Sequence, residues 1–198
     1  MNAQVSINAQ QRGSSPSNEP SIRPVPDRSP LHLVATQGQV QIHTSTFRGS
    51  FSIVLSEALR SAGLGSKVLI SQFLRGGVHQ GPNGAINLCG RLEWIRPAIE
   101  TCSPDQLEKE DLSLKRKYAE KAIKELWEFC KTRLIQKKLD KLVLDEIGIA
   151  ISLGFIKEND LISMINNRPT STDIILTGSS IPPKVIEMAD QITELRSN

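Results

Sequence analysis

The sequence predicts a three-layer α/β domain in which helices cover both faces of a mostly parallel sheet. Short apolar runs of strand length alternate with longer segments of helical periodicity from about residue 34 onward, which is the pattern of a parallel sheet covered by helices. The length of 198 residues and the hydrophobic fraction of 38% suit one domain with a sizeable core. A polar loop joins the first apolar run to the first helical segment, which gives the order strand, loop, helix.

Residues 1–33 are predicted to form a disordered arm rich in proline and serine, and residues 34–198 to form the folded domain. The arm holds five prolines among serine, asparagine, glutamine and arginine. Its sizeable apolar side chains are Val5, Ile7, Ile22 and Val25. Such a segment cannot bury enough apolar surface to offset the entropy of ordering its chain.

The strands and helices follow from hydrophobic periodicity and from turn residues. We expect strands over residues 40–42, 67–73, 92–95, 142–144, 174–176 and 191–195. We expect helices over residues 52–62, 114–134 and 159–166, and a further helix that Pro182 and Pro183 open at its first turn. The middle helix is predicted from apolar residues that repeat every four positions from Leu114 to Leu134, with this stripe packed on the sheet.

Residues 43–52 (HTSTFRGSFS) have the outline of a phosphate-binding loop. Such a loop needs several glycines for close backbone approach, a lysine for the phosphate oxygens and a hydroxyl for magnesium. Here Gly49 remains, Ser50 stands where lysine is needed, and Phe51 stands where the first hydroxyl is needed. Arg48, Ser50 and Ser52 can still contact an anion at the helix N-terminus. The loop is therefore predicted to bind phosphate weakly.

Two further segments lie where open α/β sheets bind their ligands, beyond the carboxyl ends of strands. Residues 75–84 are rich in turn formers and are predicted to form an irregular loop after the second strand. Asp145 and Glu146 follow the apolar run 142–144. An aspartate at the end of a central strand can hold magnesium, and the adjacent glutamate can orient a nucleophile or order the metal shell.

Composition and charge argue against several other classes of protein. Cys89, Cys102 and Cys130 include no close pair, so neither a zinc site nor a disulfide framework is expected. The segment 115–141 holds ten basic and four acidic residues; a solvated outer face is expected there rather than a nucleic-acid site, because few aromatic residues accompany it. Neither a membrane span nor a signal peptide is expected, so a cytoplasmic location is predicted.

Several segments resemble, in order and spacing, the ATP:corrinoid adenosyltransferases of the P-loop type. The resemblance covers residues 34–196. The segments are 58–63 (ALRSAG), 67–69 (KVL), 72–76 (QFLRG), 143–147 (VLDEI), 167–169 (NRP), 176–178 (LTG) and 189–196 (ADQITELR). The resemblance implies a P-loop NTPase-like, RecA-like domain that binds ATP, magnesium and a reduced corrinoid, whose cobalt(I) attacks the 5′ carbon of the ribose and expels triphosphate.

The resemblance also implies roles for particular residues. The phosphate-binding loop would cradle the triphosphate through Thr44, Ser45, Thr46, Arg48, Gly49, Ser50 and Ser52. Asp145 and Glu146 would serve the metal, and Gln72, Arg75 and His79 would line the corrinoid or substrate side. Arg168, Thr177 and Gly178 match motif positions, where a stabilising role is at least as well supported; Arg168 beside Pro169 can simply cap the preceding helix. His43 and His79, placed by the sequence in two loops at the site, could be a cobalt ligand or a general acid, but solvated loop histidines are favoured. Relatives of this fold often form homodimers.

The departures from the family pattern lead to three hypotheses. Two glycines and the lysine of the loop are replaced by Ser45, Phe47 and Ser50, and residues 95–104 lack the aromatic side chains that the family places against the corrinoid. The sequence stops at Asn198, where relatives are expected to continue with a tail that closes over the site. The leading hypothesis is a binding or regulatory protein with reduced or lost transferase activity and weak ATP and magnesium binding. The alternative is an active transferase that moves the 5′-deoxyadenosyl group of ATP to a cob(I) corrinoid. The third is a polyanion-binding protein.

Overall fold

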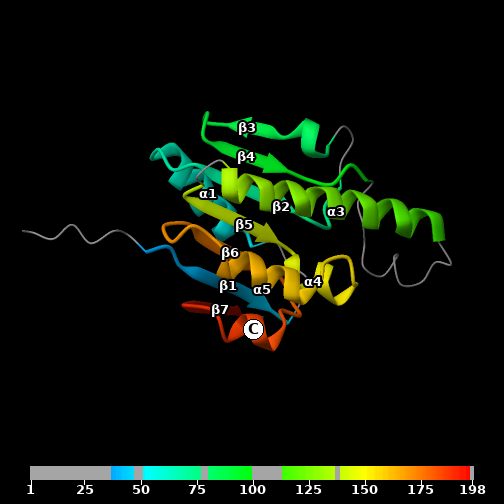
Figure 1. The fold of residues 1–198 in the computed structure, drawn as a ribbon. Helices are drawn as coiled ribbons and strands as arrows, with labels where there is room; N and C mark the ends of the chain where they lie inside the picture. The colour runs from blue at the N-terminus through cyan, green and yellow to red at the C-terminus, as the bar shows by residue number, and fades with distance from the viewer. Residues whose placement is uncertain (1–36, 47–50, 77–79, 100–112, 137–138, 197–198) are drawn as a thin grey trace, which may run out of the picture. The chain divides into compact units, whose positions relative to one another are not determined.

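A mostly parallel sheet forms the centre of the computed structural model, which describes residues 37–46, 51–76, 80–99, 113–136 and 139–196 (Figure 1). Its seven described strands lie in the order β3-β4-β2-β5-β6-β1-β7. Among them, β3 pairs antiparallel with β4, and the other neighbours pair in parallel. The predicted α/β class with a mostly parallel sheet is confirmed.

The strands are β1 (Val40–Ser45), β2 (Val68–Gln72), β3 (Ile86–Leu88), β4 (Leu92–Ile95), β5 (Lys141–Asp145), β6 (Asp173–Thr177) and β7 (Gln191–Leu195). The helices are α1 (Ser52–Gly63), the short 3-10 helix η1 (Pro82–Gly84), α3 (Ser113–Gln136), α4 (Ile147–Ser152), α5 (Glu158–Asn166) and α6 (Pro183–Ile186). Every predicted strand and helix has a counterpart among these elements. Three elements were not predicted: β3, α4 and the 3-10 helix η1, which lies where an irregular loop was expected.

The two faces of the sheet carry separate apolar clusters, because successive side chains of a strand point to opposite faces. One face packs against α3, α4, α5 and α6, of which α3, α4 and α5 lie in front of the sheet in Figure 1. The other face packs against α1. The strand residues on the α1 side are Val68, Ile70, Leu92, Val143 and Ile175, and the helix contributes Val54, Ala58 and Ala62.

The buried face of α3 differs from the predicted stripe. Leu114 and Tyr118 are 69% and 70% exposed. The buried side chains of this helix are Ala119, Ile123, Leu126, Trp127, Cys130 and Leu134. A strict repeat of four residues advances about 40° per step around a helix of 3.6 residues per turn, so its first members rotate away from the sheet. Alternating spacings of three and four keep the side chains on one face.

No helix within the described part of the chain is both long and apolar enough to span a membrane. The predicted N-terminal arm, residues 1–33, lies outside the described residues, so its prediction stands as made.

Candidate functional site

Polar side chains gather where β1, β2, β5 and β6 end at their carboxyl side. In the sheet register Gln72 lies opposite Asp145, and His43 lies opposite Thr177. Ile70, Val143 and Ile175 point to the α1 side, and residues two positions further along each strand share that face. Gln72, Asp145, Thr177 and His43 therefore form one row across four strands on the α1 side of the sheet, here called the polar row.

The carboxylate of Asp145 is held between two donors from neighbouring strands. Gln72 Nε2 donates to Asp145 Oδ2 at 2.7 Å, and Thr177 Oγ1 donates to Asp145 Oδ1 at 2.5 Å. The same Thr177 hydroxyl accepts a hydrogen bond from the Glu146 backbone N–H at 3.1 Å. Asp145 is 2% exposed. Its orientation is fixed, yet each carboxylate oxygen keeps a lone pair for a further donor or a cation.

Two residues that the sequence analysis did not single out orient Gln72. Its Oε1 accepts hydrogen bonds from Trp94 Nε1 at 3.0 Å and from Arg96 Nε at 2.7 Å. The Arg96 guanidinium also stacks over the Trp94 ring, 5.4 Å from its centroid. With two donors on its oxygen, Gln72 turns its nitrogen towards Asp145. Trp94 lies in β4, the strand beside β2, and Arg96 directly follows that strand, two positions further along. That spacing was the available signal.

The turn after β5 brings backbone segments unusually close together. Glu146 adopts a left-handed conformation with φ of 61°. Gly178, with φ of 123°, follows β6 at the same edge; a Cβ atom there would lie 3.2 Å from Glu146 Cα. At Gly148, a Cβ atom would lie 2.2 Å from the Ser179 carbonyl oxygen. Close packing between the ends of β5 and β6 thus holds Asp145 beside Thr177.

His43 belongs to β1, so the prediction that it sits in a loop was wrong. Its Nδ1 is buried and makes no hydrogen bond to any described residue. Burial lowers the pKa of the imidazole, and the negative charge of Glu57 on α1 partly opposes this effect. Its carbonyl oxygen accepts a hydrogen bond from the Gly178 N–H at 3.1 Å. His43 therefore favours the neutral form at the end of the polar row.

The predicted phosphate-binding loop is shorter than expected, because Thr44 and Ser45 continue β1. Thr46 follows the strand directly, and Ser52 is the exposed first residue of α1. Phe51 is buried in the cluster on the α1 side, and its carbonyl oxygen accepts hydrogen bonds from the N–H groups of Val54 and Leu55. Arg48, Gly49 and Ser50 lie outside the described residues. An aromatic ring, rather than a hydroxyl, thus precedes the first turn of α1.

The other predicted site residues are distributed over both edges of the sheet. Arg75 follows β2 at the same edge as the polar row; its buried Nε has no hydrogen-bond partner among the described residues. His79 lies outside the described residues. Arg168 donates to the carbonyl oxygens of Ile165 at 3.0 Å and Gly38 at 3.2 Å. It therefore caps α5 and ties it to the segment before β1, at the amino end of that strand.

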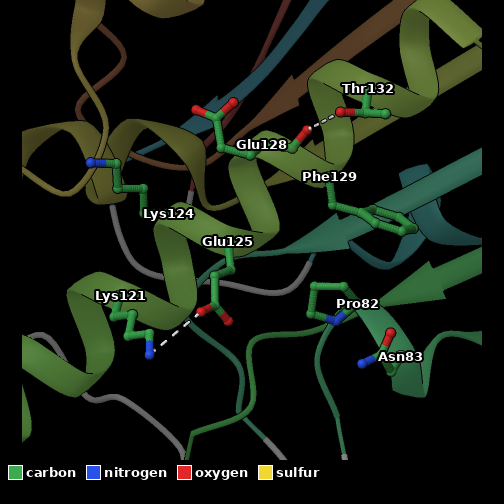
Figure 2. Close-up of a pocket in the computed structure, with 8 residues that line it drawn as sticks. All are labelled: Pro82, Asn83, Lys121, Lys124, Glu125, Glu128, Phe129 and Thr132. Carbon is green, nitrogen blue, oxygen red and sulfur yellow. Dashed lines mark hydrogen bonds and ion pairs between the residues drawn. The ribbon is translucent and has the colours of Figure 1, made fainter.

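A separate hollow of about 550 Å³ lies between η1 and α3 (Figure 2). Phe129 and Pro82 contribute its apolar surface, and Lys121 and Glu125 face each other across 3.9 Å at its rim. Because α3 covers the sheet face opposite α1, this hollow is not part of the polar row. The charged side chains that line this hollow are exposed and partly paired with one another, so they indicate no particular ligand or reaction.

Comparison with known protein families matches residues 36–198 to the family described as ATP:corrinoid adenosyltransferase BtuR/CobO/CobP. The chain belongs to this family. Its seven-stranded, mostly parallel sheet is consistent with the P-loop NTPase-like fold of the corrinoid adenosyltransferases.

Individual members of the adenosyltransferase family are similar along most of this chain. The corrinoid adenosyltransferase of Escherichia coli K12 is 26% identical over 162 residues, which cover 81% of this chain and 77% of the relative. The corrinoid adenosyltransferase CobA of Salmonella typhimurium is 27% identical over 177 residues, which cover 87% of this chain and 85% of the relative. The corrinoid adenosyltransferase of Pseudomonas aeruginosa is 26% identical over 165 residues, covering 80% and 75% of the two chains.

Proposed function

We propose that this chain transfers the 5′-deoxyadenosyl group of ATP to the cobalt(I) of a corrinoid. The observation that carries the proposal is the clamped carboxylate of Asp145 at the end of the central strand β5, in a row of polar side chains at the edge of the sheet. The similarity of more than three quarters of the chain to proteins named corrinoid adenosyltransferases supports the same assignment.

The proposed reaction needs binding and orientation more than proton transfer. The cobalt(I) electron pair forms the bond to C5′ of the ribose. The bond from C5′ to the phosphate oxygen breaks, and triphosphate leaves with the electron pair of that broken bond. The free N–H groups at the start of α1 would attract the leaving triphosphate. In this arrangement the protein contributes position and charge compensation, which are large terms in displacement reactions.

Magnesium fits the donor chemistry of the polar row. Magnesium prefers oxygen ligands and is commonly held by one or two carboxylates together with substrate phosphates. Asp145 is fixed by Gln72 and Thr177 and still has a lone pair on each oxygen. Asp145, with Glu146 beside it, would hold the ion, which supplies compensation for the charge of the triphosphate when it is bound.

The loop is expected to bind ATP less tightly than one that carries lysine. Ser50 replaces the cation that would contact the phosphate oxygens. A charge-assisted contact of that kind is typically worth about 1.5 to 3 kcal/mol, which corresponds to roughly a 10- to 150-fold difference in affinity. The proposed enzyme is therefore expected to need a higher ATP concentration than relatives that carry the lysine, while it catalyses the same adenosyl transfer.

A second candidate function is a binding or regulatory protein that has lost the transfer. The buried ring of Phe51 favours it, because this side chain occupies the position of the hydroxyl that a phosphate-binding loop offers to magnesium. In this case the chain would still bind the corrinoid but would not activate ATP for the transfer.

The polyanion hypothesis is less well supported by the described side chains. Several basic groups in and next to α3 lie beside acids: Lys121 faces Glu125 at 3.9 Å, Lys131 faces Glu128 at 2.7 Å, and Arg133 pairs with Glu93 at 2.8 Å. The polyanion hypothesis requires that the protein is retained on nucleic acid at low salt, where electrostatic binding is strongest.

The test is a transfer assay with purified protein, ATP, magnesium and chemically reduced cob(I)alamin, followed by the absorbance of the adenosylated product. We expect product from the wild type and none from Asp145→Asn, with Asp173→Asn at the amino edge of β6 as the matched control. A wild type without transfer, joined by a Ser50→Lys variant that gains it, would favour the second candidate. No transfer by either protein, with no ATP binding at about millimolar concentration, would remove the proposal.

A further inference from the structure

Arg96 lies at the same edge of the sheet as the polar row, and its guanidinium has no acidic partner among the described residues. Arg96 follows β4 directly and is half-buried. Its Nε is committed to Gln72 Oε1 at 2.7 Å. Within the described residues, no carboxylate lies at ion-pair distance and neither Nη atom makes a hydrogen bond. The two Nη donors thus have no described partner, and arginine uses such a pair of donors to recognise carboxylates and phosphates.

The surroundings of Arg96 hold it in place independently of any ligand. The Arg96 guanidinium carbon lies over the Trp94 ring, 5.4 Å from its centroid. The carbonyl oxygen of Arg96 accepts a hydrogen bond from the Gly81 N–H at 2.9 Å. The neighbouring strand β2 ends beside it, and Arg75 beyond that end also has a buried Nε without a described partner. This part of the edge is therefore preorganised and positively charged.

The position of Arg96 separates it from the phosphate-binding loop. Three strands, β2, β5 and β6, lie between β4 and β1. At a strand spacing of about 4.8 Å, the ends of β4 and β1 are about 19 Å apart. Asp145, on β5, lies between them. The side of Asp145 that faces Arg96 is therefore the side away from the loop that follows β1.

We infer that Arg96 determines substrate specificity by binding an anionic group at the periphery of the corrinoid. This inference rests on the proposed function. A displacement at C5′ requires the attacking cobalt and the leaving triphosphate on opposite sides of that carbon. If the triphosphate lies by the loop and α1, the corrinoid lies on the Arg96 side. The anions that a corrinoid offers there are a peripheral carboxylate or the phosphodiester of its nucleotide loop.

The experiment measures binding of three oxidised corrinoids by absorbance titration, so that it does not depend on turnover. Cobyrinic acid a,c-diamide carries free carboxylates, cobalamin carries the phosphodiester, and cobinamide carries neither. The variants are Arg96→Gln and Arg96→Lys, with Arg91→Gln as the control. Arg91 is an exposed arginine immediately before β4, at the opposite edge of the sheet. The hydrogen bond from Trp94 to Gln72 does not involve Arg96, so we expect it to hold Gln72 in each variant.

We expect Arg96→Gln to weaken binding of at least one anionic corrinoid about 10-fold or more, and to leave binding of cobinamide and of ATP unchanged. A loss confined to cobyrinic acid a,c-diamide identifies a carboxylate, and a loss confined to cobalamin identifies the phosphodiester. Arg96→Lys keeps the charge without the planar fork and should lose less. Thermal unfolding of each variant verifies that it is folded.

Four results would overturn the inference. Equal losses for all three corrinoids would show that Arg96 acts structurally through Gln72. Unchanged binding of every corrinoid, with transfer intact in the wild type, would refute the role of Arg96 while leaving the proposed function standing. A wild type that binds no corrinoid would refute both, and weakened ATP binding alone would assign Arg96 to the phosphates instead.

Discussion

Replacing Thr177 with valine tests how strongly the fold depends on the clamp around Asp145. The variant has nearly the same shape, so no cavity forms, but it removes the donor to Asp145 Oδ1 at 2.5 Å and the acceptor of the Glu146 N–H at 3.1 Å. A hydrogen bond to a charged group contributes about 1.5 to 3 kcal/mol, and a buried N–H that loses its acceptor costs about 1 to 3 kcal/mol. Allowing for relaxation, we expect a loss of about 3 kcal/mol.

The assay is urea unfolding followed by the fluorescence of the two tryptophans. For a urea dependence of about 2 kcal/mol per molar, the midpoint should fall by about 1.5 M. Thr193→Val is the matched control. Thr193 is half-buried on β7 opposite His43, and its hydroxyl makes no hydrogen bond to a described residue. This control should stay within about 0.5 kcal/mol of the wild type. If Thr177→Val were equally mild, the hydrogen bonds to Asp145 would not stabilise this edge.

Three further predictions concern the same edge of the sheet. His43→Gln should flatten the pH dependence of stability. Because burial lowers the pKa of His43 in the folded protein, the unfolded chain binds more protons than the folded chain as the pH falls. In urea titrations the wild type should therefore lose more stability than the variant between about pH 7.5 and about pH 5.5. A wild type no more sensitive than His43→Gln would contradict this. Gly148→Ala should destabilise the fold by about 3 kcal/mol, since its Cβ would lie 2.2 Å from the Ser179 carbonyl oxygen. The control Gly63→Ala places its Cβ where no atom lies within 4 Å, so it should be nearly neutral or slightly stabilising. Equal unfolding midpoints of the two variants would refute the close approach at Gly148. Ser50→Lys should raise ATP affinity about 10-fold or more in calorimetry, and an unchanged affinity would mean that the loop does not contact phosphate.

Much of the sheet was predictable because its strands are apolar runs of ordinary length. The carboxyl end of β1 was less predictable: the predicted strand stopped at residue 42, whereas β1 continues through the polar residues His43, Thr44 and Ser45. Apolar runs indicate where a strand is buried in the core, and they stop where side chains turn towards a site. The largest error in a strand boundary therefore lies at the carboxyl end of β1, where His43 joins the polar row.

The elements that the sequence did not indicate are short. The strand β3, Ile86–Leu88, is largely exposed and lies among turn-forming residues, so it lacks the apolar pattern of a buried strand. The helix α4, Ile147–Ser152, follows Glu146 in a left-handed conformation without a side-chain cap. No start signal of the usual kind marks it.

The members of the candidate site were predicted singly rather than as a network. Gln72, Asp145 and Thr177 were each singled out, but their hydrogen bonds depend on the register between β2, β5 and β6, which long crossover connections determine. Trp94 and Arg96 were overlooked because an aromatic and a basic residue at a strand end have many ordinary roles. Only the pairing of β4 with β2 brings them to Gln72.

The account depends on Asp145 as the centre of a nucleotide site, and calorimetric titration of ATP with magnesium measures this most directly. The wild type should bind ATP only when magnesium is present, and Asp145→Asn should bind at least about 10-fold more weakly, while Asp173→Asn should match the wild type. Equal ATP affinity of the wild type and Asp145→Asn, or binding that magnesium does not change, would contradict the account.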